Sequence, residues 1–153
     1  MDPDATPGAP GPGRKDRTKN RSGGSPSERP RLLLVGGAGG FVGRALLREL
    51  GSEYAIRSVH RRVAPVESGR VEWVAADATG PVDWARALAG VRVVVNLAWF
   101  RWESPERFRA LHDGLRRLLA AAERARVERF LQVSVPPATP EMERTLPYLL
   151  YKR

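Results

Sequence analysis

A glycine-rich segment, Gly36–Gly43 (GGAGGFVG), joins an apolar run to a helical pattern. The preceding residues Leu32–Val35 are continuously apolar, as expected of a strand buried on both faces. Where such a strand turns into a helix, free backbone amides meet the positive end of the helix dipole. The chemistry that this arrangement predicts is the binding of a phosphate or pyrophosphate group. The alternative interpretation is a glycine-rich connection without a ligand.

Three glycines have distinct roles in the phosphate-binding interpretation. Gly37 permits a tight turn, Gly40 lets the backbone approach a pyrophosphate, and Gly43 lets the helix pack close to the strand. The residues of this segment that we predict to bind a dinucleotide are Gly37, Gly40, Phe41, Val42, Gly43 and Arg44.

The end of the second predicted strand indicates which dinucleotide the segment would bind. NAD-selective sites place Asp or Glu there to bind the ribose hydroxyls, whereas residues 57–62 read RSVHRR and contain no carboxylate. Guanidinium groups bind a 2′-phosphate through charge-assisted, often bidentate hydrogen bonds. We therefore predict NADP, with NAD as the alternative, and assign Arg61 and Arg62 to the phosphate, with Arg44 able to join them. The arginine-rich composition of the whole chain is the competing explanation for these arginines.

The rest of the chain alternates short apolar segments with amphipathic ones. Strands are expected over Leu32–Val35, Ala55–Val59, Val71–Ala75, Val91–Leu97 and Phe130–Val135. Helices are expected after Gly43 up to Gly51, from Pro81 as a first helical residue to Gly90, and from Ser104 as N-cap to about Arg126. The pattern predicts an α/β fold: a Rossmann-type parallel sheet of about five strands in the order 3-2-1-4-5, with helices on both faces.

Composition divides the chain into a tail, residues 1–30, and a folded domain, residues 31–153. The tail is rich in Pro, Gly, Ser and charged residues and nearly lacks large apolar side chains, so we expect it to be disordered. The formal net charge of +9 raises the question of nucleic-acid binding. The tail contributes only six basic against four acidic residues, and the remaining positive charge is spread over helices that also carry Asp and Glu. The charge distribution therefore disfavours nucleic acid as a partner.

Other site classes are also disfavoured by composition. The chain has no cysteine, and its two histidines, His60 and His112, lack the spacing of metal ligands, so we predict no metal site. No apolar run reaches the length of a membrane span, and no signal peptide is visible, which makes the cytoplasm the expected compartment.

With these segments identified, the sequence resembles the extended and atypical short-chain dehydrogenase/reductases, the group of NAD-dependent epimerases, dehydratases and NmrA-like proteins. The segments that carry the resemblance are Gly36–Arg44 (like TGxxGxxG), Ala76-Asp77, Asn96–Ala98, Val127–Ser134 and Tyr148–Lys152 (YxxxK). Their order and spacing over residues 31–153 are more specific than any one of them.

The resemblance implies roles for individual residues. Asp77 and Ala78 would lie near the adenine, and Asn96, Leu97 and Ala98 would line the cofactor. Ser134, Tyr148 and Lys152 would form the catalytic group: Tyr148 and Lys152 lie four residues apart on one helix face, and the ammonium would lower the pKa of the phenol. Tyr148 and Tyr151 packing on an apolar helix face is the alternative interpretation.

The sequence also departs from the group's pattern. Gly36 replaces the threonine of TGxxGxxG, Trp99 stands where glycine is usual, Asp113 stands where asparagine is common, and Val135 follows Ser134 where a second serine is frequent. Members of the group continue well beyond YxxxK, whereas only Arg153 follows here. We therefore expect the domain to be incomplete on its C-terminal side: a fragment, a truncated gene product, or a chain completed by a partner. The uncovered sheet edge also favours self-association into a homo-oligomer.

Three functional hypotheses follow from these residues. The first is the cofactor-binding part of an oxidoreductase or epimerase acting on a small molecule that the sequence does not identify, inactive as this chain alone. The second is a non-catalytic NADP-binding sensor or a truncated remnant without turnover. The third is a basic interaction protein.

Overall fold

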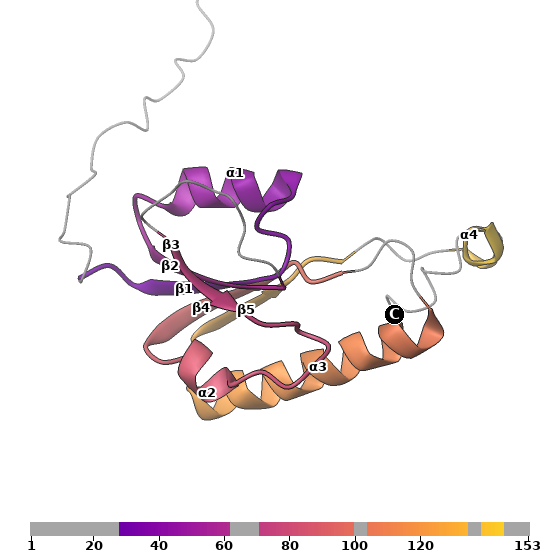
Figure 1. Ribbon diagram of the computed structural model, residues 1–153. Helices are drawn as coiled ribbons and strands as arrows, with labels where there is room; N and C mark the ends of the chain where they lie inside the picture. Colours follow the sequence, from indigo (N-terminus) through magenta and orange to yellow (C-terminus); the bar gives the residue numbers. More distant parts are fainter. Residues whose placement is uncertain (1–27, 62–70, 100–103, 135–138, 146–153) are drawn as a thin grey trace, which may run out of the picture.

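The computed structural model describes residues 28–61, 71–99, 104–134 and 139–145 (Figure 1). Its elements are β1 (Arg31–Val35), α1 (Phe41–Leu50), β2 (Ala55–His60), β3 (Val71–Ala75), α2 (Trp84–Ala87), β4 (Val91–Asn96), α3 (Pro105–Arg124), β5 (Arg129–Gln132) and α4 (Pro140–Thr145). Residues 1–27 of the predicted tail lie outside the described residues, so the boundary at residue 30 stays a prediction.

The five strands form one sheet in the order β3-β2-β1-β4-β5, and every pair of neighbours is parallel. The predicted fold class and strand order are confirmed. β1 lies in the centre, where Leu33 is in register with Arg57 of β2 and Val94 of β4. Parallel neighbours need crossover connections, and α1 joins β1 to β2 while α3 joins β4 to β5.

Helices cover both faces of the sheet (Figure 1). α1 lies on one face and packs on a cluster that includes Leu32 and Leu34. α2 and α3 lie on the opposite face, over a cluster that includes Leu33 and Val35. Successive side chains of a strand point to opposite faces, so all four residues Leu32–Val35 of β1 must be apolar to fill both clusters. This is why the run before the glycines identifies the strand.

Two helix starts test the predicted caps. Ser104 caps α3 as expected: its hydroxyl accepts a hydrogen bond from the Arg107 amide at 3.4 Å. The predicted start at Pro81 is wrong, because α2 begins only at Trp84. The Asp83 carboxylate accepts from the Arg86 amide at 3.0 Å, and this carboxylate cap places the helix start three residues after the proline.

Two predicted strands are longer than the observed ones. β4 ends at Asn96 rather than Leu97, because the Asn96 side-chain oxygen accepts a hydrogen bond from the Ala98 amide at 3.1 Å and turns the chain. β5 begins one residue earlier than predicted and ends at Gln132, and Val135 lies outside the described residues.

Arg57 of β2 holds α2 against the sheet. Its guanidinium is buried, and Nη1 donates to the backbone oxygens of Ala87 at 2.7 Å and Arg86 at 3.0 Å. Nη2 pairs with the Glu72 carboxylate of β3 at 2.9 Å. A four-residue helix is unstable by itself, and a cation on its last carbonyls supplies the bonds that the helix end lacks. The first arginine of the RSVHRR segment is therefore occupied within the fold.

We predict that Arg57→Met lowers the free energy of unfolding by about 2–4 kcal/mol, because buried carbonyls lose their charged donor. Arg48→Met is the matched control, since Arg48 is exposed and only pairs with Glu49 at 3.6 Å; we expect a change within about 0.5 kcal/mol. Urea denaturation of the two variants measures both values. Equal losses would contradict the anchoring role of Arg57.

Candidate functional site

The turn after β1 packs closely against the segment after β4. Gly36 and Gly37 have φ of 66° and 64°, in the left-handed region that favours glycine. A Cβ on Gly36 would lie 2.8 Å from the Cα of Ala98, and one on Gly37 would lie 2.8 Å from the Cβ of Leu97. Both the backbone conformation and the available space therefore require glycine, as the predicted tight turn at Gly37 implies.

The end of the turn leaves the N-terminus of α1 open. Gly40 is the N-cap, has no side chain to accept from the helix amides, and donates its own amide to the Gly37 oxygen at 2.9 Å. No acidic residue lies in the first turn of α1. The first amides of a helix have no intrahelical acceptor, so those of Phe41, Val42 and Gly43 are available to an anion.

Gly43 sets how closely α1 approaches the turn. A Cβ at this position would overlap the Gly37 carbonyl oxygen and lie 2.7 Å from the Cα of Ala38. The space beside Gly39, in contrast, is open to at least 4 Å. This geometry fits the role predicted for the third glycine, and it leaves the outer side of the turn accessible.

A cleft of about 370 Å³ opens at the carboxyl ends of the parallel strands, beside the turn. This is the position at which ligands bind open α/β sheets, where the strand order reverses on either side of β1. Apolar residues and polar groups both line it, and its polar side chains follow or end β2 and β3. The described residues that line it are Gly36, Gly37, Val59, His60, Arg61, Ala76, Asp77, Ala78, Thr79, Ala98, Trp99 and Leu111.

Asp77 is the carboxylate among the described lining residues. Its Oδ1 accepts hydrogen bonds from the Thr79 amide at 2.9 Å and the Thr79 hydroxyl at 2.8 Å. Its Oδ2 lies 4.0 Å from Nη2 of Arg107. Partial burial raises the pKa of Asp77, but the bonds from Thr79 and the charges of Arg61 and Arg107 outweigh it and hold the pKa below its usual value. The carboxylate is therefore ionised at neutral pH.

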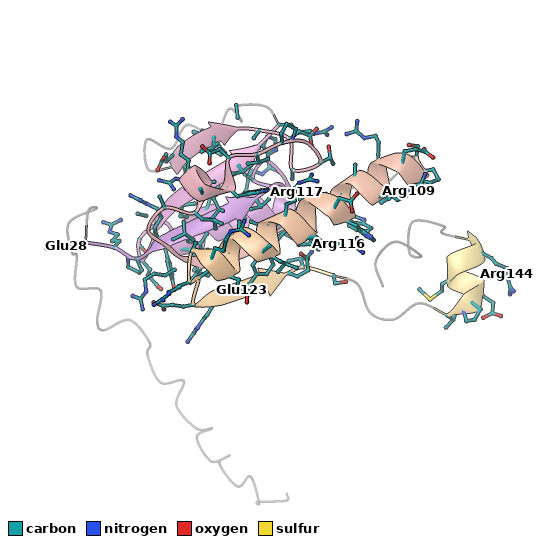
Figure 2. The ribbon with its side chains drawn as sticks, turned by 90° about the horizontal axis from the view of Figure 1, so that it is seen from below. Glu28, Arg109, Arg116, Arg117, Glu123 and Arg144 are labelled. Atoms are coloured by element: carbon teal, nitrogen blue, oxygen red, sulfur yellow. The ribbon has the colours of Figure 1, made fainter. Side chains whose placement is uncertain are left out.

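Helix α3 holds the loop that carries Asp77. A Cβ on Gly114 would overlap the Ala78 carbonyl oxygen, so the helix backbone contacts the loop directly. Arg117, one turn along α3, donates to the oxygens of Thr79 at 3.3 Å and Gly80 at 3.2 Å (Figure 2). Neither Gly114 nor Arg117 was predicted to belong to the site. The sequence did contain one signal, a glycine inside an otherwise strong helical pattern. A glycine destabilises a helix, so it is expected there mainly where a close contact leaves no room for a side chain.

Asn96 organises the segment after β4 and is not among the described residues that line the cleft. It is buried, its Nδ2 donates to Oε1 of Gln132 at 2.8 Å, and its Oδ1 accepts the Ala98 amide. Ala98 and Trp99 then line the cleft. The Trp99 ring packs against buried Phe108 of α3, with the ring centroids 5.4 Å apart. The tryptophan that departs from the group's pattern is thus part of the cleft wall.

The remaining predicted residues lie in different parts of the fold. Phe41, Val42 and Arg44 are exposed at the start of α1, and the Phe41 side chain is 86% exposed. Arg61 lines the cleft, whereas Leu97 packs behind it. Ser134 is exposed after β5. Arg62, Tyr148 and Lys152 lie outside the described residues, so their roles stay predictions.

Within the described part of the chain, no group of three His, Cys, Asp or Glu side chains is placed to hold a metal. No helix among the same residues is long and apolar enough to cross a membrane.

Comparison with known proteins gives one family match and several structural matches. The model of a family described as NAD(P)H-binding matches residues 37–152. No curated protein matches the sequence. A short-chain dehydrogenase/reductase superfamily protein from Agrobacterium tumefaciens, solved with bound NAD, is 31% identical, with a TM-score of 0.62 over 79% of this chain and 42% of that one.

Two further solved structures are similar. MoeE5 in complex with UDP-glucose and NAD is 28% identical, with a TM-score of 0.56, covering 69% of this chain and 36% of that one. A mutant uronate dehydrogenase from Agrobacterium tumefaciens complexed with NAD is 25% identical, with a TM-score of 0.56, covering 68% of this chain and 40% of that one. This chain therefore spans less than half the length of each of these three structures. The predicted resemblance to the short-chain dehydrogenase/reductases is confirmed.

We predict that Gly43→Ala lowers the free energy of unfolding by about 1–3 kcal/mol, because α1 must move away from the turn to make room for the methyl group. Gly39→Ala places the same methyl group in open space and serves as the control. Thermal or urea unfolding of the pair should show the loss for residue 43 alone. A neutral Gly43→Ala would contradict the close contact.

Gly114→Ala tests the contact between α3 and the cleft loop. Helix propensity alone would raise the free energy of unfolding by about 1 kcal/mol in the alanine variant. The overlap of the new methyl group with the Ala78 oxygen should outweigh this gain, so we expect the variant to be less stable by about 1–3 kcal/mol. The reciprocal variant, Ala120→Gly, lies at an exposed position of the same helix and should lose about 1 kcal/mol. Stabilisation by Gly114→Ala would show that the helix does not depend on this contact.

Proposed function

Because the chain belongs to the NAD(P)H-binding family, we propose that its cleft binds a dinucleotide and prefers NADP to NAD. The pyrophosphate would lie on the N-terminus of α1, and the adenosine ribose beside the end of β2. The observation that carries the preference is Arg61, which lines the cleft at the position where NAD-selective sites present a carboxylate.

The turn supports the position of the pyrophosphate. Gly40 provides no side-chain cap, and the space beside Gly39 is open, so a phosphate can approach the amides that start α1. A helix N-terminus without acidic side chains is also electrostatically suited to an anion. The fit of the residues to a pyrophosphate thus rests on the shape of the turn and on its unused donors.

The end of β2 supports a 2′-phosphate. Among its described residues, Val59, His60 and Arg61 line the cleft, and none is acidic. Arg57 cannot contribute, because its guanidinium holds α2 and Glu72. Support for NADP comes from this chain's own residues, since the three similar structures named above contain NAD.

We further propose that the complete protein is a dehydrogenase or epimerase of the short-chain type acting on a small molecule. Bound dinucleotide would accept or supply a hydride, Ser134 would orient a substrate oxygen, and Tyr148 would exchange a proton with it. Lys152 would keep the pKa of the phenol low enough for that exchange. A non-catalytic NADP-binding sensor is the second candidate, and a search for turnover with NADPH separates the two.

We predict that the chain binds NADPH more tightly than NADH, and that Arg61→Gln weakens NADPH binding by about tenfold or more with a smaller effect on NADH. A hydrogen-bonded charge pair of about 1.5–3 kcal/mol would be lost only with the phosphorylated cofactor. Thermal-shift or fluorescence titration with both cofactors measures the effect.

Arg48→Gln is the matched control for that titration. It removes the same charge from the last turn of α1, away from the residues that line the cleft. We expect it to leave both affinities within about twofold, because exposed charges beyond a Debye length of about 8–10 Å are largely screened. Equal weakening of both cofactors by Arg61→Gln would count against the proposed 2′-phosphate contact.

A further inference from the structure

Arg44 is a cation that forms no contact with the rest of the described fold through its charged end. It is exposed in α1, one helical turn after the N-cap, and its backbone amide donates to the Gly40 oxygen at 3.0 Å. Within the described part of the chain, its guanidinium forms no hydrogen bond or ion pair. Arg57 and Arg117, in contrast, each donate to backbone oxygens of the fold. A stabilising contact therefore does not explain why arginine stands at position 44.

The position of Arg44 is electrostatically unfavourable without a ligand. The N-terminal end of a helix carries a partial positive charge, so a cation close to it destabilises the helix. The first turn of α1 contains no acidic residue that would offset this effect. Arg48, four residues further on, lies on the same face of α1, and like charges at this spacing repel each other. Arg44 therefore destabilises α1 in two ways.

An anion at the start of α1 would offset both effects. The proposed pyrophosphate would lie on the amides of Phe41, Val42 and Gly43. Side chains of a helix lean towards its N-terminus, which directs the long Arg44 side chain back towards these amides. The same turn borders the cleft, since Gly36 and Gly37 line it. A residue that breaks a local rule of stability but complements a ligand is typical of a binding site.

We propose that Arg44 binds the pyrophosphate, and that the chain loses stability at this position in exchange for affinity. The inference rests on the proposed function, which places the pyrophosphate on the N-terminus of α1. It differs from the role that the sequence predicted for Arg44, because the pyrophosphate is common to NAD and NADP whereas the 2′-phosphate is not. Arg44 then strengthens the binding of both cofactors and contributes nothing to the choice between them.

The test is a charge series at residue 44 of the whole chain. Arg44→Gln and then Arg44→Glu should raise the melting temperature of the ligand-free chain stepwise, by about 1–5 °C per step. The same steps should weaken the binding of NADH, NADPH and ADP, which all contain a pyrophosphate, by about fivefold or more per step. Arg44→Lys keeps the charge and should stay close to the unmodified chain in both respects. Thermal denaturation without ligand and titration calorimetry measure the two quantities.

Arg48→Gln is the matched control. It removes the same charge and the same repulsion, but from the last turn of α1, where a cation is favourable. These two effects offset each other, so we expect no rise in the melting temperature. The affinities for the three ligands should stay within about twofold of the unmodified chain, because the charge is distant from the pyrophosphate and screened.

Opposite trends of stability and affinity distinguish ligand binding from a structural role. The proposal is overturned if the glutamine and glutamate variants bind as tightly as the unmodified chain, since the arginine-rich composition then explains the residue. It is also overturned if they weaken NADPH alone, which would place Arg44 on the 2′-phosphate, or if they lower the melting temperature.

Failure of the proposed function gives a different pattern. If the unmodified chain binds none of the three ligands, the proposed cleft function is wrong and the inference is overturned with it. If the unmodified chain binds NADH and NADPH equally, only the proposed NADP preference is contradicted. Weakening of both cofactors across the series would then still support the role of Arg44.

Discussion

The cleft depends on two places where backbone meets backbone without an intervening side chain. At Gly43, α1 lies directly on the Gly37 carbonyl, and at Gly114, α3 lies directly on the Ala78 carbonyl. The first contact fixes the phosphate-binding end of α1 relative to β1. The second fixes the loop after β3 relative to the segment after β4, because α3 also packs against Trp99 through Phe108. Each wall of the cleft is thereby held by a helix whose approach is limited only by main-chain atoms.

Besides the ligand-binding role proposed for Arg61, arginines in this chain also stabilise the fold. Within the part of the chain that the structure describes, arginines donate to backbone oxygens far away in the sequence: Arg29 to Gly51, Arg31 to Ala89, Arg57 to Ala87, and Arg117 to Thr79 and Gly80. The planar guanidinium presents five donors in a fixed arrangement, which suits carbonyls at helix ends and loops. Part of the high positive charge therefore holds connections in place.

The features that could be predicted from the sequence are those that short, local residue patterns determine. Leu32–Val35 and the glycines after it identify a buried strand, a turn and a helix start, and repetition of that alternation leads to the strand order. The start of α2 was misplaced, because Pro81 suits a first helical position and Asp83 suits the N-cap of a helix that begins at Trp84, and only the cap geometry decides between the two starts. Gly114, Arg117 and Arg107 were missed because their partners lie about 30 or more residues earlier in the chain. Such contacts exist only after the strands have brought the segments together.

The direct contact of Gly114 with Ala78 also has a kinetic consequence. The Asp77 loop cannot move outward without carrying α3 with it, and α3 is packed on the core through Leu118 and Phe108. The described walls are therefore preformed, and a ligand does not have to wait for these walls to open. Association with such a cleft follows a single phase whose rate rises linearly with ligand concentration, without the plateau that a slow conformational step imposes.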